Sequence, residues 1–161
     1  MKKLVIAAAT LALGMSAWTT QAATDSKNFS IDITLTAVCT VSTPANVAFT
    51  YTSNQGGVST ATGGAFAVTC TNGLGYSLGL FEGATPSGSG TPTLAPAADN
   101  VVNLSYTLGL SATSGTGSGA AQNFSVTGSM AAGQPGTCVT AGGVCSNAAA
   151  TNRTHTVILT Y

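Results

Sequence analysis

Apolar and polar residues alternate most regularly in the stretch KNFSIDITLTAVCTV, residues 27–41. Four large apolar residues are separated there by single Ser, Asp or Thr residues: Phe29, Ile31, Ile33 and Leu35. A period of two places all four side chains on one face of an extended chain. The pattern therefore predicts an amphipathic β-strand over residues 29–42, close to the start of the chain.

Shorter apolar runs follow, each bounded by Gly, Pro, Asn or Ser, and none of them shows a helical period. We expect further strands at residues 46–52, 65–71, 75–82, 101–110, 122–128 and 154–161. Segments 83–96 and 111–119 are rich in Gly, Ser, Thr and Pro, and are predicted to be loops. This succession of short strands predicts one all-β domain, an immunoglobulin-like β-sandwich.

The beginning of the chain has the order of a secretory signal peptide. Met1 and two lysines precede the apolar run 4–9, which continues loosely to Ala17, and small residues stand at Thr20 and Ala22. The unbroken apolar stretch is too short for a transmembrane anchor, which needs about 20 residues. We expect cleavage after Ala22 and hence an exported protein.

Charged residues are scarce. The sequence has four Lys and Arg residues against four Asp and Glu residues, and removal of Lys2 and Lys3 with the signal leaves a formal charge of 2 − 4 = −2. Lys27 and Arg153 alone cannot form the basic surface that nucleic acid or an anionic membrane requires. Charged residues make up 5% of the sequence, against about 25% in typical domains, so charge repulsion protects little against self-association.

Four cysteines lie in the expected mature chain: Cys39, Cys70, Cys138 and Cys145. An even number in an exported protein favours disulfide bonds, with three pairings open. Cys138 and Cys145 are close in sequence and flank two glycines, which indicates a small peripheral loop and leaves Cys39 for Cys70. A zinc site is the alternative, but it is disfavoured because paired Cys-x-x-Cys spacing is absent and the chain has one histidine.

Residues that could carry catalysis are few. The one histidine, His155, lies between threonines in the last expected strand and is predicted to face solvent. The four acidic residues show no acid/base spacing, and the glycine-rich segments lack the Lys of a phosphate-binding loop. The sequence therefore predicts no enzyme, no cofactor and no metal site.

A family resemblance rests on four segments in order: LTAVCTV (35–41), FAVTCTNG (66–73), FSVTGSMAAGQ (124–134) and HTVILTY (155–161). Together with the aromatic last residue, they make the chain resemble the spore coat protein U domain family, which includes the pilins of archaic chaperone–usher pili. The resemblance covers essentially the whole mature chain. The chain departs from the family's pattern at residues 100–113 and in the loop between Cys138 and Cys145, which has the character of an insertion.

The resemblance implies an immunoglobulin-like β-sandwich that lacks its own final strand and exposes an apolar groove. In such pilins a periplasmic chaperone fills the groove during transit. At the outer-membrane usher, the N-terminal extension of the next subunit replaces the chaperone strand. The implied division is a signal peptide at 1–22, a donor-strand extension at 23–37 and a pilin-like domain at 38–161.

The resemblance also implies roles for individual residues. The donor residues would be Phe29, Ile31, Ile33 and Leu35, whose side chains enter the groove of a neighbouring subunit. Val157, Leu159 and Tyr161 would lie on one face of the last strand, beside the groove that the chaperone fills first and the donor later.

The implied function is that of a structural subunit of a surface pilus, exported through the periplasm and joined head to tail to identical or related subunits. Such a pilus would support adhesion and biofilm formation. The alternative is a self-sufficient secreted β-sandwich, either a coat protein or a carbohydrate- or surface-binding protein, in which residues 29–37 form the first strand of the chain's own sheet. Carbohydrate binding is disfavoured because the only tryptophan, Trp18, lies in the signal.

Overall fold

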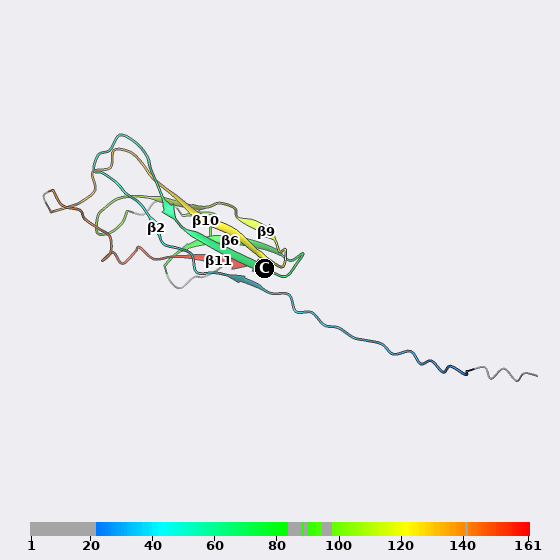
Figure 1. The fold of residues 1–161 in the computed structure, drawn as a ribbon. Coiled ribbons are helices and arrows are strands. Elements are labelled where there is room, and N and C mark those ends of the chain that lie inside the picture. Colours follow the sequence, from blue (N-terminus) through cyan, green and yellow to red (C-terminus); the bar gives the residue numbers. More distant parts are fainter. Residues whose placement is uncertain (1–21, 84–87, 89, 95–97, 141) are drawn as a thin grey trace, which may run out of the picture. The chain divides into compact units, whose positions relative to one another are not determined.

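A computed structural model describes residues 22–83, 88, 90–94, 98–140 and 142–161. The chain divides into two units, Met1–Thr34, of which residues 22–34 are described, and Leu35–Tyr161. The described residues contain strands, turns and irregular segments but no helix, so none of their segments is a helix that could span a membrane (Figure 1). The predicted all-β class is confirmed. The predicted signal peptide lies almost entirely outside the described residues.

The larger sheet has the strand order β1-β5-β10-β8-β7, and each of its pairs is antiparallel. Its strands are β1 (Cys39–Val41), β5 (Ala65–Cys70), β10 (Ala121–Met130), β8 (Thr107–Leu110) and β7 (Thr93–Leu94). A short strand, β3 (Ser59–Thr60), pairs with the last residues of β10.

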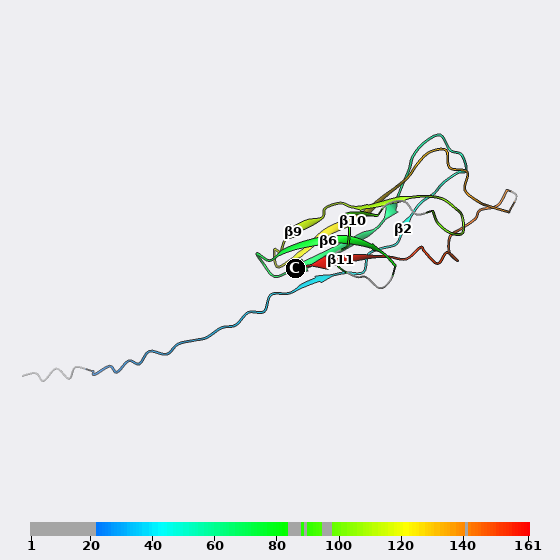
Figure 2. The ribbon, with the colours of Figure 1, turned by 180° about the vertical axis from the view of Figure 1, so that it is seen from behind.

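The smaller sheet has the order β11-β6-β9 and is also antiparallel (Figure 2). It consists of β11 (His155–Thr160), β6 (Gly75–Glu82) and β9 (Ser114–Thr116). Two further short strands, β2 (Val47–Ala48) and β4 (Thr62–Gly63), pair with each other.

Both larger sheets contribute to one apolar core. The AFAVTC sequence of β5 buries every second side chain, and the GYSLGLFE sequence of β6 does the same over most of its length. The buried cluster contains Phe66, Val68 and Cys70 from β5 and Tyr76, Leu78 and Leu80 from β6, together with Cys39, Leu108 and Val126. Burial of a Val, Leu or Phe side chain contributes about 1.5–3 kcal/mol, so these residues provide much of the driving force for folding.

The strand register defines two ends of the unit formed by residues 35–161. At one end, here named the β1 end, Cys39 pairs with Cys70, and β11 finishes opposite the start of β6. The hydroxyl of Tyr76, near the start of β6, donates a 2.9 Å hydrogen bond to Gln122, near the start of β10, so the two sheets share this end.

At the opposite end, here named the loop end, β6 finishes and β11 starts with the pair Glu82 and His155. Tyr106, just before β8, lies 2.7 Å from His155 and joins the two sheets there. The connections around residues 50–58, 98–106, 131–140 and 142–154 gather at this end, away from the C-terminus (Figure 1).

Four predicted strands are confirmed closely, those at 65–71, 75–82, 122–128 and 154–161, which correspond to β5, β6, β10 and β11. Three others are much shorter than predicted: 29–42 is a strand only in β1, 46–52 only in β2 and 101–110 only in β8. The predicted loops at 83–96 and 111–119 were wrong in part, since they contain β7 and β9. These two strands consist largely of Ser, Thr and Gly, and their pairing partners rather than their own apolar pattern make them strands.

A turn explains why the strand predicted at 101–110 starts late. The carboxylate of Asp99 accepts hydrogen bonds of 2.8 Å from the backbone N–H groups of both Val101 and Val102. Asn103 then adopts a φ of 51°, a left-handed conformation that ends an extended run. The apolar residues of this segment therefore belong to a turn at the loop end.

Candidate functional site

The two larger sheets of the described residues end in four edge strands, β1 and β7 in one and β11 and β9 in the other, and the candidate site lies at β1 and β11. β11 pairs with β6 alone, and β1 pairs with β5 alone. The two strands approach each other closely. Edges of this kind carry rows of backbone donors and acceptors that can accept another strand.

The register shows which backbone groups of β11 face its open edge. Leu80 of β6 exchanges two backbone hydrogen bonds with Thr91, of 2.7 and 2.9 Å, and the N–H of Leu78 donates to Thr113. The backbone groups of Leu80 and Leu78 therefore point away from β11. Their partners in the register, Val157 and Leu159, form non-hydrogen-bonded pairs with them, so the N–H and C=O groups of these two residues point outward.

The side chains of Val157 and Leu159 point the other way, since both are half-buried and pack against the apolar core. Tyr161 follows the strand and is exposed. Two of the three residues predicted beside a groove thus combine an apolar side chain on the core with backbone groups at an open edge. The third, Tyr161, lies beyond the last paired residue of β11.

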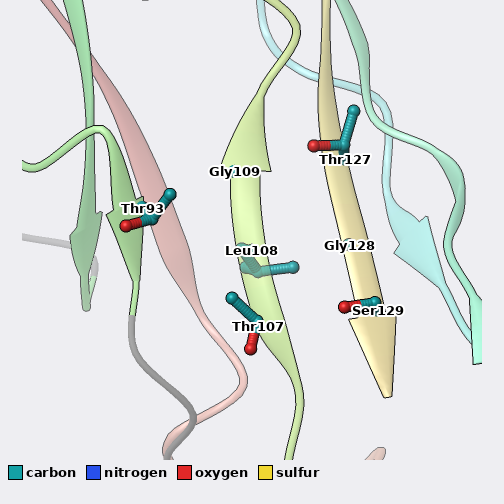
Figure 3. Close-up of a pocket in the computed structure, with 7 residues that line it drawn as sticks. All are labelled: Thr93, Thr107, Leu108, Gly109, Thr127, Gly128 and Ser129. Carbon is teal, nitrogen blue, oxygen red and sulfur yellow. The ribbon is translucent and has the colours of Figure 1, made fainter. Parts of the chain in front are cut away.

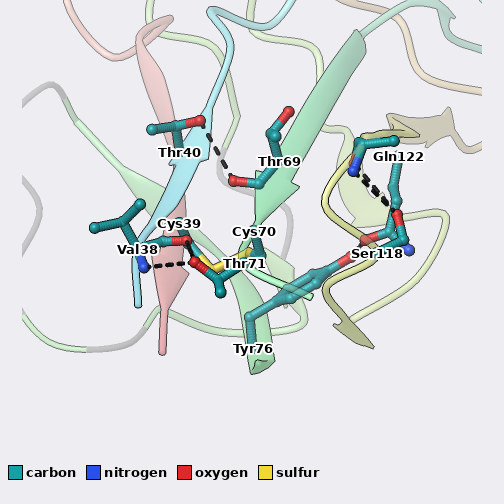
Figure 4. The surroundings of a disulfide bond; sticks show 10 residues. Val38, Cys39, Thr40, Thr69, Cys70, Thr71, Tyr76, Ser118 and Gln122 are labelled. Atoms are coloured by element: carbon teal, nitrogen blue, oxygen red, sulfur yellow. Dashed lines mark hydrogen bonds between the residues drawn. A yellow bond between two sulfur atoms is a disulfide. The ribbon is translucent and has the colours of Figure 1, made fainter. Parts of the chain in front are cut away.

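A disulfide bond fixes β1 to β5. Cys39 is bonded to Cys70, its neighbour in the register, and both residues are buried (Figure 4). The N–H of Val38 donates to the Thr71 hydroxyl at 3.0 Å, and the N–H of Thr71 donates to the carbonyl of Val38 at 2.9 Å. β1 is therefore held firmly on one side, although it is only three residues long.

The opposite side of β1 is open. Val38 bonds toward β5, and the N–H of Ser42 donates to the carbonyl of Ala67 at 2.8 Å. By the alternation of an antiparallel ladder, the backbone groups of Cys39 and Val41 point away from β5. The unpaired backbone edges of β1 and β11 together make up the candidate site, and we use the name open groove for these two edges.

The second disulfide joins Cys138 to Cys145, as expected from their spacing. The loop is peripheral, since Val139 and Val144 are 95% and 98% exposed. No group of three or more His, Cys, Asp or Glu residues in the described part of the chain is placed to hold a metal ion.

The four residues predicted to act as donors do not form a strand in the structure. Phe29, Ile31 and Ile33 lie in the 22–34 unit, and Leu35 begins the other unit. All four side chains are exposed. The segment's ion pair, between Lys27 and Asp25, is exposed as well. The alternation of this segment is therefore not used by any sheet of the described residues.

His155 differs from the prediction that it faces solvent. It is half-buried, its ring meets that of Tyr106 edge-on, and its Nε2 lies 2.7 Å from the Tyr106 hydroxyl. Burial lowers the pKa of His155, and the Glu82 carboxylate acts in the opposite direction. Burial also raises the pKa of Tyr106, with Glu82 and Asp99 adding to the effect. The pair is a contact between the two sheets at the start of β11.

A hollow of about 300 Å³ lies on the larger sheet (Figure 3). Its lining residues are Thr93, Thr107, Leu108, Gly109, Thr127, Gly128 and Ser129. Thr93 and Thr127 flank Gly109 in the register, and a side chain at this glycine would meet the Thr127 hydroxyl and the Thr93 methyl group. None of the lining residues is titratable, so the hollow offers no acid, base or charged ligand for catalysis.

Comparison with known proteins gives one result at the level of the family. The model of the Spore Coat Protein U domain matches residues 8–159. Comparisons with curated proteins and with solved structures found no match. Because the matched region covers nearly all of the sequence, the chain belongs to the Spore Coat Protein U domain family, which is known as the archaic chaperone–usher pilin family.

Proposed function

We propose that the protein is a subunit of a surface pilus and that it polymerises by donor-strand complementation. Residues 1–22 direct export, residues 23–37 form the donor extension, and residues 38–161 form the pilin-like domain. Membership of a family of non-enzymatic surface proteins supports this proposal, as do the disulfide bonds, which are typical of proteins outside the cytoplasm.

The open edge of β11 is the observation that carries the proposal. Val157 and Leu159 already place their side chains on the core, while their backbone groups find no partner strand among the described residues. A strand added there gains backbone hydrogen bonds and covers apolar side chains at the same time. This combination is the requirement for β-augmentation.

The strand order supports an immunoglobulin-like sandwich without its final strand. In that fold one sheet has the order A-B-E-D and the other has the order C-F-G. The order β1-β5-β10-β8 corresponds to A-B-E-D, and β6-β11 corresponds to C-F. The missing strand G would lie on the open edge of β11.

The N-terminal segment has the properties of the missing strand. Phe29, Ile31, Ile33 and Leu35 alternate with polar residues and are exposed. Burial of each such side chain is worth about 1.5–3 kcal/mol, from which the cost of ordering the extension must be subtracted. Donation to the next identical copy repeats without closing and therefore produces an open filament.

In this proposal a periplasmic chaperone occupies the open groove first, and an outer-membrane usher exchanges the chaperone strand for the donor segment of the next subunit. The assembled protein then lies on the cell surface, where the pilus supports adhesion and biofilm formation. The low charge of the chain supports early protection by a chaperone, because an unfilled apolar groove on a weakly charged protein promotes aggregation.

Deletion of residues 23–36 tests the proposal. We expect the truncated protein, produced with its chaperone, to be a folded, disulfide-bonded monomer that does not polymerise alone. A synthetic peptide of residues 27–37 should bind it after the chaperone is displaced, whereas a peptide of the same composition in scrambled order should not. A self-sufficient sandwich predicts the opposite result, since loss of its first strand would unfold the domain even beside the chaperone.

A further inference from the structure

The exposed large apolar side chains of the described residues fall into three groups. One group is the donor segment, with Phe29, Ile31, Ile33 and Leu35. A second group lies in or beside the β1 end, with Val38, Val41 and Tyr161. A third lies in the connections of the loop end, with Val58, Val101, Val139 and Val144. The donor group has a role in the proposed function, and the backbone of Val41 belongs to the open groove, whereas the side chains of the third group have no role in that function.

Two valines of the third group, Val139 and Val144, lie in the loop that the Cys138–Cys145 disulfide closes. Before the loop, the N–H of Thr137 donates to the carbonyl of Val102 at 2.7 Å. After the loop, the side-chain amide of Asn100 donates to Thr151 at 2.6 Å. These two contacts and the disulfide restrain the segment at Thr137, Thr151 and the Cys138–Cys145 bond, which lowers the ordering cost when Val139 and Val144 contact a partner.

The length of the connection between the donor segment and β1 limits where the donating copy can lie. Leu35 is the last donor residue, and Cys39 begins β1 only four positions later. A fully extended chain covers at most about 3.6 Å per residue, so the β1 end of the donating copy stays within about 14 Å of the place where its donor segment leaves the groove.

The direction of the donor strand relative to β11 determines at which end of the accepting copy the donor segment leaves the groove. All strand pairs of the described residues are antiparallel, and antiparallel pairing is somewhat more stable per residue than parallel pairing. A donor antiparallel to β11 ends beside His155, at the loop end. A parallel donor would instead bring two β1 ends together and leave the valines of the loop end without a partner.

We propose that the Cys138–Cys145 loop of one copy contacts the β1 end of the copy that donates its strand, through Val139 and Val144 on one side and Val38 and Tyr161 on the other. This contact rests on the proposed function and extends it, since it adds a second attachment between neighbouring subunits. The donor strand holds the two copies together, and the loop restricts the angle between them.

Photocrosslinking in the full-length, exported protein tests the contact. A benzophenone amino acid replaces Val144, and the assembled protein is irradiated and then boiled in detergent to separate strands that are not covalently joined. We expect a covalent dimer whose crosslinked peptide contains residues of the β1 end, such as Val38 or Tyr161, of another copy. The same amino acid at Thr127, in the middle of β10 between the two ends, should give no dimer.

A charge variant gives a second measurement. With the benzophenone at Val144, Val139→Asp should abolish the dimer because a carboxylate would be buried without a partner, while polymers still form through the donor strand. Polymers that form but crosslink elsewhere, or not at all, would overturn this contact and leave the proposed function intact. Complete absence of polymers from the unmodified protein would overturn both.

Discussion

At the scale of single residues, the open groove depends on two residues of β11 whose side chains and backbone groups point in different directions. Val157 and Leu159 direct apolar side chains to the core and their N–H and C=O groups away from β6. Their identity as apolar residues of the last strand could be predicted from the sequence. The direction of their backbone groups could not, because it follows from the pairing of Leu80 with Thr91 in a different part of the chain.

The alternation of the donor segment leads to a prediction for Ile33 and Asp32. Ile33→Asp in the 27–37 peptide should weaken its binding to the truncated protein by at least about a hundredfold, because an unpaired carboxylate would enter an apolar site. Asp32→Ala should change the affinity by less than about threefold, since residue 32 faces the opposite side. Fluorescence titration with labelled peptides measures both. Equal losses for the two peptides would show that the segment does not bind as a strand.

His155 leads to a prediction about pH. Its pKa in the folded protein lies below the usual value of 6.5 because burial disfavours the charged ring. The unfolded chain therefore binds a proton at higher pH than the folded chain does, and stability declines as the pH falls below about 6.5. Thermal unfolding at pH 7.5 and pH 5.5 should show this decline, and His155→Gln should reduce it. An undiminished decline in the variant would assign the effect to other groups.

At the scale of elements, the sequence predicted strands best where the core dictates them. β5, β6 and β11 lie within a residue of their predicted ranges because their apolar residues alternate and are buried or half-buried. β7 and β9 were missed because residues such as Thr93 and Ser114 have no apolar pattern, and only their neighbours in the sheets make them strands. The half-buried position of His155 was missed because it depends on Tyr106, which is distant in sequence.

The two disulfides differ in what they hold together, which leads to a third prediction. Cys39 and Cys70 are 31 residues apart, are buried, and attach β1 to the core. Replacing both with Ala should lower the free energy of unfolding by about 3–4 kcal/mol in the chain-entropy model. Replacing Cys138 and Cys145 with Ser should cost much less, because the released loop gains freedom in the folded protein as well as in the unfolded one.

Urea unfolding of the chaperone-free truncated domain, filled with the 27–37 peptide, measures both double variants under the same conditions. The Cys138/Cys145 variant should also be exported and should still polymerise, since the donor strand does not involve this loop. The opposite result would be loss of the Cys138/Cys145 variant from the periplasm while the Cys39/Cys70 variant accumulates normally. That result would show that Cys138–Cys145, and not Cys39–Cys70, is the disulfide that stabilises the domain.

At the scale of the whole molecule, the proposed polymer has a polarity that each subunit shares. One part of the chain donates a strand and another part accepts one, so a copy that lacks residues 23–36 can accept but cannot donate. Such a copy can occupy only one end of a filament. Because each later subunit is added through its own donor strand, the truncated copy can start a filament but cannot extend one. When it is mixed with full-length subunits during assembly, the mean filament length should therefore fall as its fraction rises, since the same full-length subunits are divided among more filaments.

Electron microscopy of filaments assembled at several mixing ratios measures this effect. Full-length Asp32→Ala subunits, mixed at the same ratios, are the matched control and should leave the length unchanged, because they retain both the donor face and the open groove. A labelled truncated copy should also be found at a single end of each filament, the end that is assembled first. Labelled truncated copies distributed along the filaments would mean that subunits are joined by surfaces other than the donor segment, and the open edge of β11 would then need a different explanation.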